Sequence, residues 1–395
     1  MELALNKHGN GTSALSGERV LDLTDEKGML CSRLLADMGA EVIRAEKVGG
    51  VSAGSASFEV NNLGKRSVTL NLEVEPGQKI LRQLVKTADV LVESYQPGYL
   101  ESLGLGYPAL SQINPRLIMA SLSGCGQDGP YRDYHSDDMV ALALGGQMSV
   151  CGEPQLPPLK PFGRQAYYSA CLFSAIGIML ALWHRHTSGK GQYIDISRNE
   201  CVAATLDHVL VRYFYQGVVA KRQGNLYWNN AFRTFPCRDG YILLSLFQQW
   251  ETLVEWLDDE GMADDLTDKK WLDRERRLEQ FDHIIGVLER WTRSHTVSEL
   301  VAKGQLMGFP WAEITSIPQL VASPQLEERG FWVQVEHPET GRKNIFPGVP
   351  CKLGRSPWRA GSRIPAPGEH NVEIYHGDLG LSGQEIEALT REGVI

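Results

Sequence analysis

The sequence predicts an α/β protein with one large domain and one smaller domain. Its 395 residues are 43% hydrophobic, enough for a large core and consistent with two domains. In the first third of the chain, short apolar runs of strand character alternate with helical patterns, as in a parallel sheet. From about Gln223 the sequence pattern changes: two strand-like runs are followed by helical segments rich in charged residues and Trp.

The first three elements define the large domain. Arg19–Leu23 is an apolar run of strand character, and the polar loop Thr24–Gly28 follows it. Met29–Met38 has helical spacing and ends at Gly39, a suitable C-cap, before Glu41–Ala45 returns to a strand pattern. This strand–helix–strand order predicts a Rossmann-like beginning. The first turn lacks the GxGxxG pattern and carries two acids, so NAD binding is disfavoured.

The remaining elements follow from the same patterns. Further strands are predicted at Val68–Leu72, Val90–Ser94 and Leu117–Leu122, and helices at Gly77–Thr87, Tyr99–Ile113 and Ser169–Trp183. In the smaller domain the strands are Phe232–Pro236 and Tyr241–Leu246, and the helices are Trp250–Asp258, Arg274–Arg293 and Val297–Lys303. After Gly348 a proline-rich tail is expected to wrap over a surface and to end in the helix Ser382–Arg391.

These elements suggest domain boundaries. We expect a flexible N-terminus at 1–17, a large domain from 18–200 and 331–395, a linker helix at 201–225 and a small α+β domain at 226–330.

Composition excludes several functions. The net charge is −9 without a basic stripe, which argues against nucleic-acid binding. The apolar run Ala170–Trp183 is too short to cross a bilayer, so a buried core helix is expected there and no membrane partner. Seven scattered cysteines with no CxxC pair, and no signal-peptide pattern in Met1–Gly17, predict a cytoplasmic protein without a disulfide framework or a metal site.

A series of short motifs carries a family resemblance from about residue 18 to 395. They are Arg19–Leu23, Leu34–Arg44, Gly64–Val68, Ala88–Glu93, Leu103–Tyr107, Asn114–Ile118, Gly126–Tyr131 and Pro367–Asn371. In this order they resemble the class III CoA-transferases, the CaiB/BaiF or formyl-CoA transferase-like family. The resemblance implies a Rossmann-like large domain built from both chain termini, a small domain, and two subunits interlocked like linked rings. It also implies CoA or acyl-CoA as substrate and no tightly bound cofactor.

The family's nucleophile is missing. In class III CoA-transferases an aspartate attacks the acyl-CoA thioester, and counting back from Ala175–Ile178 places Tyr167 at that position. A slip in the alignment does not rescue it, because the chain has no aspartate or glutamate between Glu153 and Asp195. A phenol has a pKa of about 10 and cannot form an exchangeable anhydride, so Tyr167 is expected to fill or pack the pocket.

The resemblance also implies CoA contacts, which it places at Lys27, Arg44, Leu70, Leu72, Tyr95 and Gly98. Several neighbours depart from the family pattern. Glu73 stands where a basic residue is usual, Ser94–Gly98 reads SYQPG in place of NFRPG, and the first loop contains Asp25 and Glu26. Acids near a polyphosphate weaken its binding by charge alone, so the site is expected to be eroded in several places.

Three functions remain open. The first is an aspartate-lacking subunit of a heteromeric CoA-transferase, as in succinyl-CoA:(R)-benzylsuccinate CoA-transferase, whose partners are an aspartate-containing paralogue, an acyl-CoA and a dicarboxylic acid. The second is a self-sufficient transferase or isomerase that uses another acid, such as Asp137. The third is a non-enzymatic acyl-CoA-binding scaffold. A racemase is disfavoured because Asp137 and Tyr167 stand where that enzyme keeps its two acid/base groups.

Overall fold

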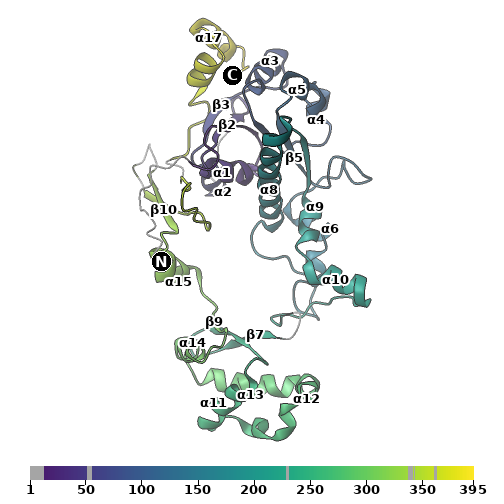
Figure 1. Ribbon diagram of the computed structural model, residues 1–395, viewed down its shortest axis with the longest axis vertical. Helices are drawn as coiled ribbons and strands as arrows, with labels where there is room; N and C mark the ends of the chain where they lie inside the picture. The colour runs from purple at the N-terminus through teal and green to yellow at the C-terminus, as the bar shows by residue number, and fades with distance from the viewer. Residues whose placement is uncertain (1–12, 51–55, 228–230, 337–340, 342, 360–362) are drawn as a thin grey trace. The chain divides into compact units, whose positions relative to one another are not determined.

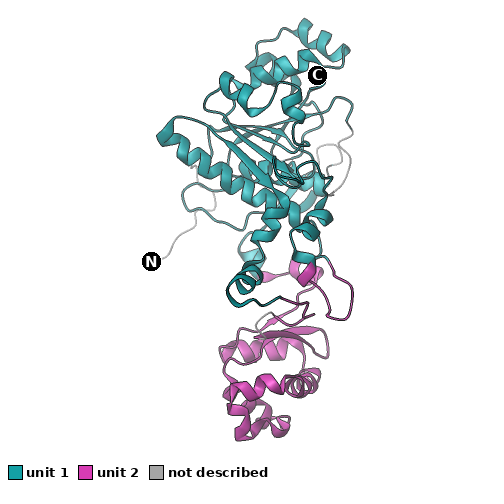
Figure 2. Cartoon of the chain, turned by 90° about the vertical axis from the view of Figure 1, so that its right-hand side faces the viewer, with its two compact units in different colours: residues 1–148, 160–219, 325–395 teal, residues 149–159, 220–324 magenta. Residues whose placement is uncertain are grey.

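The computed structural model describes residues 13–395 except 51–55, 228–230, 337–340, 342 and 360–362. The chain forms two compact units (Figure 2). Unit 1 runs to Met148 and resumes over Lys160–Val219 and Gln325–Ile395, whereas unit 2 comprises Ser149–Leu159 and Ala220–Pro324. The large unit is therefore built from both ends of the described chain.

A six-stranded parallel sheet forms the centre of unit 1. Its strands are β1 (Arg19–Leu23), β2 (Glu41–Glu46), β3 (Arg66–Thr69), β4 (Val90–Glu93), β5 (Ile118–Ser123) and β6 (Tyr193–Ser197). They lie in the order β3-β2-β1-β4-β5-β6, and Val20 pairs with Val42 on one side and Val90 on the other. This is the strand order of a Rossmann fold, so the predicted α/β fold class is confirmed.

Helices cover both faces of this sheet (Figure 1). Helices α1 (Met29–Asp37) and α8 (Gln165–Ser188) pack on one face, and α3 (Glu75–Val85) and α5 (Tyr107–Ile113) on the other. The other helices between residues 29 and 216 are α2 (Ala56–Asn61), α4 (Tyr99–Ser102), α6 (Asp138–Leu144), α7 (Gln147–Val150), α9 (Arg198–Ala204) and α10 (Asp207–Gln216). Alternate strand residues point to opposite faces. Val20 therefore packs with α1 and α8, whereas its neighbour Leu21 packs with α3.

Helix α8 is longer than the predicted Ser169–Trp183 and is buried on one face only. Cys171, Ala175 and Ile178 pack into the core, but Leu180 and Trp183 are exposed. By length and composition alone α8 could span a bilayer, and half of its most apolar window is buried within the protein. Its buried face packs against β5 and β6, as expected of a sheet-covering helix. The expectation of a buried core helix therefore holds for that face alone.

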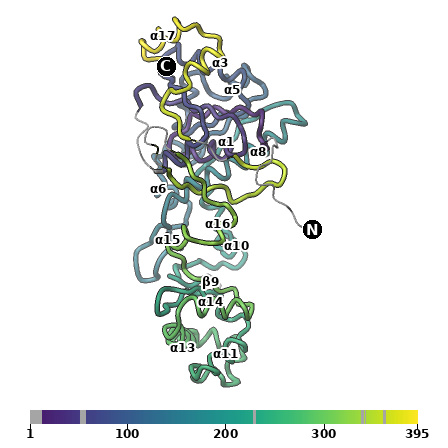
Figure 3. The backbone as a smooth tube through the Cα atoms, turned by 90° about the vertical axis from the view of Figure 1, so that its left-hand side faces the viewer, coloured from purple at the N-terminus to yellow at the C-terminus, as the bar shows by residue number. Residues whose placement is uncertain are grey.

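The C-terminal segment returns to the first strands of unit 1. After the hairpin of β10 (Trp332–Glu336) and β11 (Lys343–Pro347), a π-helical turn at Glu373–Asp378 precedes α17 (Gly383–Arg391). The Tyr375 hydroxyl donates to the Thr69 carbonyl over 2.7 Å, and the backbone N–H of Asn71 donates to the Val394 carbonyl over 2.8 Å. Figures 1 and 3 show α17 close to α3.

Unit 2 has α+β organisation around a tryptophan-rich core. Its antiparallel sheet has the order β7-β8-β9, with β7 at Phe232–Pro236, β8 at Tyr241–Ser245 and β9 at Ala312–Glu313. The helices are α11 (Trp250–Asp259), α12 (Arg274–Glu279), α13 (Phe281–Arg293), α14 (Val297–Leu306) and α15 (Ile317–Val321), with short 3-10 turns at Asp264–Thr267 and Lys269–Leu272. The helix α16 (Pro324–Glu328) begins at its last residue. Trp256, Trp291 and Trp311 contact one another in the core.

Several predicted helices are divided. Tyr99–Ile113 is interrupted by Gly104, whose φ of +66° ends α4 and allows α5 to start in a new direction. The expected linker helix at 201–225 is instead the end of α9 and all of α10, which stops at Gly217 with φ +65°. Of the expected flexible terminus, residues 1–12 lie outside the described residues, but Leu15 donates a backbone hydrogen bond to Met38.

Candidate functional site

A cavity of about 230 Å³ opens at the carboxyl ends of β1, β2 and β4. Leu23, Thr24, Asp25, Arg44, Ala45, Glu46, Lys47, Gly50, Phe58, Ser94 and Tyr95 line it. Open α/β sheets bind ligands at this edge, because the loops that follow the strands diverge there. The loops after three strands, β1, β2 and β4, thus converge on one candidate site.

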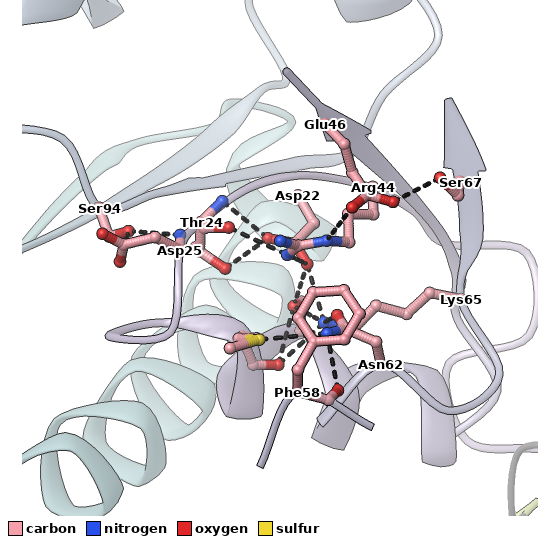
Figure 4. Close-up of polar contacts among 12 residues, drawn as sticks. Asp22, Thr24, Asp25, Arg44, Glu46, Phe58, Asn62, Lys65, Ser67 and Ser94 are labelled. Carbon is pink, nitrogen blue, oxygen red and sulfur yellow. Dashed lines mark hydrogen bonds and ion pairs between the residues drawn. The ribbon is translucent and has the colours of Figure 1, made fainter. Parts of the chain in front are cut away.

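A buried ion cluster underlies this cavity (Figure 4). The Lys65 ammonium lies 2.8 Å from Asp22 Oδ2, and it also donates to the Ser32 hydroxyl, the Asn62 side-chain carbonyl and the Met29 carbonyl. Arg44 lies 3.5 Å from the same Asp22 carboxylate and donates to the Thr24 carbonyl over 2.9 Å.

The Asp22 carboxylate of this cluster lies between two cations. Burial lowers the pKa of Lys65 to about 8, although Asp22 opposes that shift. Burial would raise the pKa of Asp22, but Lys65 and Arg44 together hold it well below its ordinary value. A fully enclosed ammonium surrounded by four oxygen atoms has no donor left for a ligand. Lys65 therefore positions the loops of the cavity and does no chemistry itself.

Two of the predicted CoA contacts line the cavity directly. The Arg44 guanidinium lies 5.4 Å from the Phe58 ring centroid, and the Tyr95 ring packs on Tyr99 at 4.7 Å. The backbone N–H of Tyr95 donates to Glu93 Oε2 over 2.7 Å, which holds the loop after β4. Arg44 and Tyr95 therefore present a cation and an aromatic face to one cavity.

The other predicted contacts lie differently. Lys27 is paired with Asp25 at 2.6 Å, and Gly98 is the N-cap of α4 with φ +86°, a conformation that favours glycine. The side chains of Leu70 and Leu72 are buried in the hydrophobic core and do not line the cavity. Any contact of these two residues with a ligand would therefore come from the backbone.

The two acids of the first loop, Asp25 and Glu26, form hydrogen bonds and ion pairs within the protein. The Ser94 hydroxyl donates to Asp25 Oδ1 over 2.8 Å, and Arg164 lies 2.7 Å from Glu26. Glu73, outside the cavity, lies 3.6 Å from Lys47. These contacts reduce the repulsion that the sequence predicts for a polyphosphate, since each carboxylate has a cation within 4 Å.

Tyr167 lies in the first turn of α8, near the carboxyl ends of β5 and β6. Its side chain is buried, and its backbone N–H donates to Asp138 Oδ1 over 3.1 Å. The guanidinium groups of Arg164 and Arg198 lie 5.8 and 5.4 Å from the centroid of its ring. Burial raises the pKa of the Tyr167 phenol, which further disfavours a reactive phenolate.

Arg198 is a site residue that the sequence analysis missed. It begins α9 directly after β6, it is 4% exposed, and its Nη2 donates to the Ser136 carbonyl over 3.0 Å. Its Nε and Nη1 are buried without a hydrogen-bond partner among the described residues, and burial lowers its pKa. The only signal in the sequence is a basic residue at the end of a strand.

Two further carboxylates, Asp137 and Glu93, lie at the ends of secondary-structure elements. Asp137, the alternative acid, is exposed and accepts a hydrogen bond from the Val140 N–H over 2.8 Å, so it serves as the N-cap of α6. Glu93, at the end of β4, was missed, and burial raises its pKa to about 7. No cluster of three or more His, Cys, Asp or Glu side chains suited to a metal occurs in the described part of the chain.

Two CoA-transferases of known function match this chain over nearly its whole length. Subunit BbsE of the Thauera aromatica succinyl-CoA:(R)-benzylsuccinate CoA-transferase is 33% identical over 401 residues, or 95% of this chain and 97% of the relative. The formyl-CoA:oxalate CoA-transferase of Streptomyces avermitilis is 32% identical over 416 residues, or 97% of this chain and 100% of the relative.

A solved structure and a family profile also match this chain over most of its length. The crystal structure of a CaiB/BaiF family protein from Brucella suis superposes with a TM-score of 0.81 and 28% identity, covering 93% of this chain and 99% of that one. The profile of CoA-transferase family III matches residues 15–371. The resemblance seen in the motifs is confirmed, and the chain belongs to CoA-transferase family III.

Proposed function

We propose that this chain is the aspartate-lacking subunit of a heteromeric CoA-transferase that moves CoA between carboxylic acids. The observation that carries the proposal is Tyr167, which stands at the family's nucleophile position and packs between two guanidinium groups. Neither its buried phenol nor the capping carboxylate Asp137 is suited to accept an acyl group. A paralogous subunit would supply the aspartate.

In such a heteromer the reaction takes place on the paralogue. Its aspartate attacks the acyl-CoA carbonyl and releases the CoA thiolate, which leaves a mixed anhydride. The thiolate then attacks the aspartyl carbonyl of the anhydride, which releases the first acid and forms an aspartyl-CoA thioester. The carboxylate of the second acid attacks this thioester, which releases the CoA thiolate and forms a second mixed anhydride. The thiolate then attacks the new acyl carbonyl of this anhydride, which yields the new acyl-CoA and regenerates the aspartate.

The exposed apolar side chains of unit 1 support a partner chain. One set lies on α8 and α10, namely Leu172, Phe173, Ile176, Leu180, Trp183, Val211, Tyr213, Phe214 and Tyr215. Trp183, Phe214 and Tyr215 are more than three-quarters exposed, at 76%, 77% and 87%. Large exposed apolar patches mark interaction surfaces in soluble proteins. A related chain interlocked with this one, as the family resemblance implies, would cover them.

The cavity at β1, β2 and β4 is the proposed contact with CoA. Its volume of about 230 Å³ is below the range of roughly 300–1,000 Å³ that holds a whole drug-sized ligand, so it would hold one part of the CoA molecule. Arg44 can pair with a phosphate, and Phe58 and Tyr95 offer aromatic faces to a base. The name of the BbsE relative makes succinyl-CoA and (R)-benzylsuccinate the first substrates to assay.

Co-expression with a paralogue that has aspartate at the position of Tyr167 tests the proposal. We expect the two chains to co-purify and to exchange CoA between succinate and a second acid, while this chain alone is inactive. The matched control replaces the paralogue's aspartate by asparagine, which should abolish exchange without dissociating the complex. Robust exchange by this chain alone, or no association with any such paralogue, would refute the heteromer. CoA binding without turnover would favour a scaffold.

A further inference from the structure

Arg198 is a buried cation with no carboxylate within ion-pair distance in the described part of the chain. Its guanidinium makes one hydrogen bond, to the Ser136 carbonyl, and no ion pair among the described residues. Arg185 is equally buried but lies 2.6 Å from Glu18 and 2.9 Å from Asp89. Buried charges in folded proteins are normally paired, because the loss of hydration must be offset. An unpaired guanidinium at the carboxyl ends of the strands therefore indicates a missing anion.

The surrounding backbone leaves room for this guanidinium. A Cβ at Gly124 would lie 2.5 Å from the Cβ of Ser136, which would have to shift, and would touch Arg198 Nη2 at 3.4 Å. Arg198 also lies over the face of Tyr167, at 5.4 Å from the ring centroid. The aromatic face partly compensates the charge, but it offers no acceptor for the Nε and Nη1 hydrogens.

We infer that Arg198 anchors a subsite for the carboxylate of the free acid, with the Tyr167 ring covering the guanidinium until the acid displaces it. The identity of the ligand as the acid substrate rests on the proposed function. A carboxylate suits this place better than a phosphate dianion, because the second nearby cation, Arg164, is already paired with Glu26. A planar guanidinium also matches a carboxylate in shape and in hydrogen-bond geometry.

This subsite holds the acid without reacting with it. The chain has Arg198 beside the position where the family has its aspartate, so a carboxylate supplied by the ligand takes the place of the missing side chain. The binding step is non-covalent and requires only that the Tyr167 ring turn aside. Arg198 is thus a specificity-determining residue that selects anionic ligands.

Binding of acetate, succinate and benzoate to the purified chain tests the inference, by calorimetry and by thermal melting. We expect saturable binding of at least one acid to the wild-type chain. Arg198→Met should weaken that binding by about tenfold or more, since a charge-assisted hydrogen bond is lost. Without acid, Arg198→Met should melt at the same temperature as the wild type or higher, because an unpaired buried charge is removed.

Two further variants separate a ligand role from a structural one. Arg185→Met is the matched control, since it leaves Glu18 and Asp89 without their cation; it should melt at a lower temperature yet bind acid normally. Tyr167→Ala should bind acid more tightly than the wild type, because no ring competes for the guanidinium. Arg198→Lys keeps the charge but not the planar fork and should bind with intermediate affinity.

The binding measurements can overturn the inference about Arg198. The inference is overturned if none of the three acids binds saturably to the wild type, or if Arg198→Met binds as tightly as the wild type. If Arg198→Met does not fold, Arg198→Lys and Tyr167→Ala decide, and unchanged affinity in both overturns it. Acid binding that depends on Arg198, in a chain that associates with no paralogue, would refute the heteromer and leave the subsite standing.

Discussion

Two buried cations of unit 1, Lys65 and Arg198, differ in what surrounds them. Lys65, under the cavity at β1 and β2, is enclosed by a carboxylate, a hydroxyl and two carbonyl oxygens. Arg198, at β6, has one carbonyl acceptor and an aromatic ring. The first arrangement is complete without a ligand, whereas the second is not. The difference separates a structural cluster from a site that awaits an anion.

The largest expected effect is the loss of the Lys65 cluster. Lys65→Met should lower the free energy of unfolding by about 3–5 kcal/mol, because it leaves the Asp22 carboxylate buried without its closest cation. Urea denaturation followed by circular dichroism measures this. The exposed pair of Lys47 and Glu73 supplies the control, since Lys47→Met should change stability by less than about 1 kcal/mol. If Lys65→Met and Arg198→Met lowered the free energy of unfolding equally, the two sites would not differ in the way proposed.

Glu93, on the strand between the two sites, should make stability depend on pH. Its pKa is raised from 4.5 to about 7, mainly by burial, so the folded chain binds more protons than the unfolded chain between these values. The contribution of Glu93 to the free energy of unfolding is therefore fully present below pH 4.5 and is lost as the pH rises through 7.

Glu93→Gln should therefore stabilise the protein at pH 8 by about 3 kcal/mol and leave it unchanged at pH 4.5. The glutamine carbonyl can still accept the Tyr95 N–H, which preserves the loop. Denaturation curves across this pH range check the prediction. Parallel pH profiles for the variant and the wild type would show that Glu93 is ionised in both states.

Asp137 offers a smaller, local effect. Asp137→Ala should cost about 1 kcal/mol, because α6 loses its N-cap, whereas Asp137→Asn keeps the cap and should cost almost nothing. Neither variant should change CoA exchange by the heteromer. Asn in place of Asp removes the acid without removing the cap, so a loss of activity in Asp137→Asn would restore Asp137 as a catalytic group.

The smallest expected effect belongs to Tyr167→Phe. The ring that covers Arg198 is retained, and only the hydroxyl is removed. We expect unchanged CoA exchange by the heteromer and a change in unfolding free energy within about 0.5 kcal/mol. Thermal melting and the exchange assay of the co-purified complex measure both. A large loss of activity would show that the phenol takes part in the reaction.

Much of the fold could be predicted from the sequence. The runs at Arg19–Leu23 and Phe232–Pro236 match β1 and β7 at both ends, because apolar alternation and turn residues act locally. The β10–β11 hairpin was missed, and α8 extends beyond its apolar run at both ends. Its polar ends carry no hydrophobic pattern, and the C-terminal end is set by Gly189 in the left-handed conformation.

The candidate site was only partly predictable. Arg44 and Tyr95 line the cavity as expected, but Leu70 and Leu72 point into the core, because alternate residues of that segment face the hydrophobic side. Glu93 is the last residue of β4, and Arg198 directly follows β6. Their residue types are visible in the sequence, but their burial depends on neighbours far along the chain.

The sequence by itself determined the α/β periodicity, the family motifs and the absence of an aspartate or glutamate between Glu153 and Asp195, since these depend on residue types and short spacings. Only the tertiary structure decided which charges meet. Asp22 and Lys65 are 43 residues apart and pair because β1 and β3 flank β2 in the sheet. Among the described residues Arg198 has no carboxylate within ion-pair distance, and the strand order brings it to Tyr167 and Ser136. Local propensity acts over a few residues, whereas the matching of buried charges is fixed by the order of the strands.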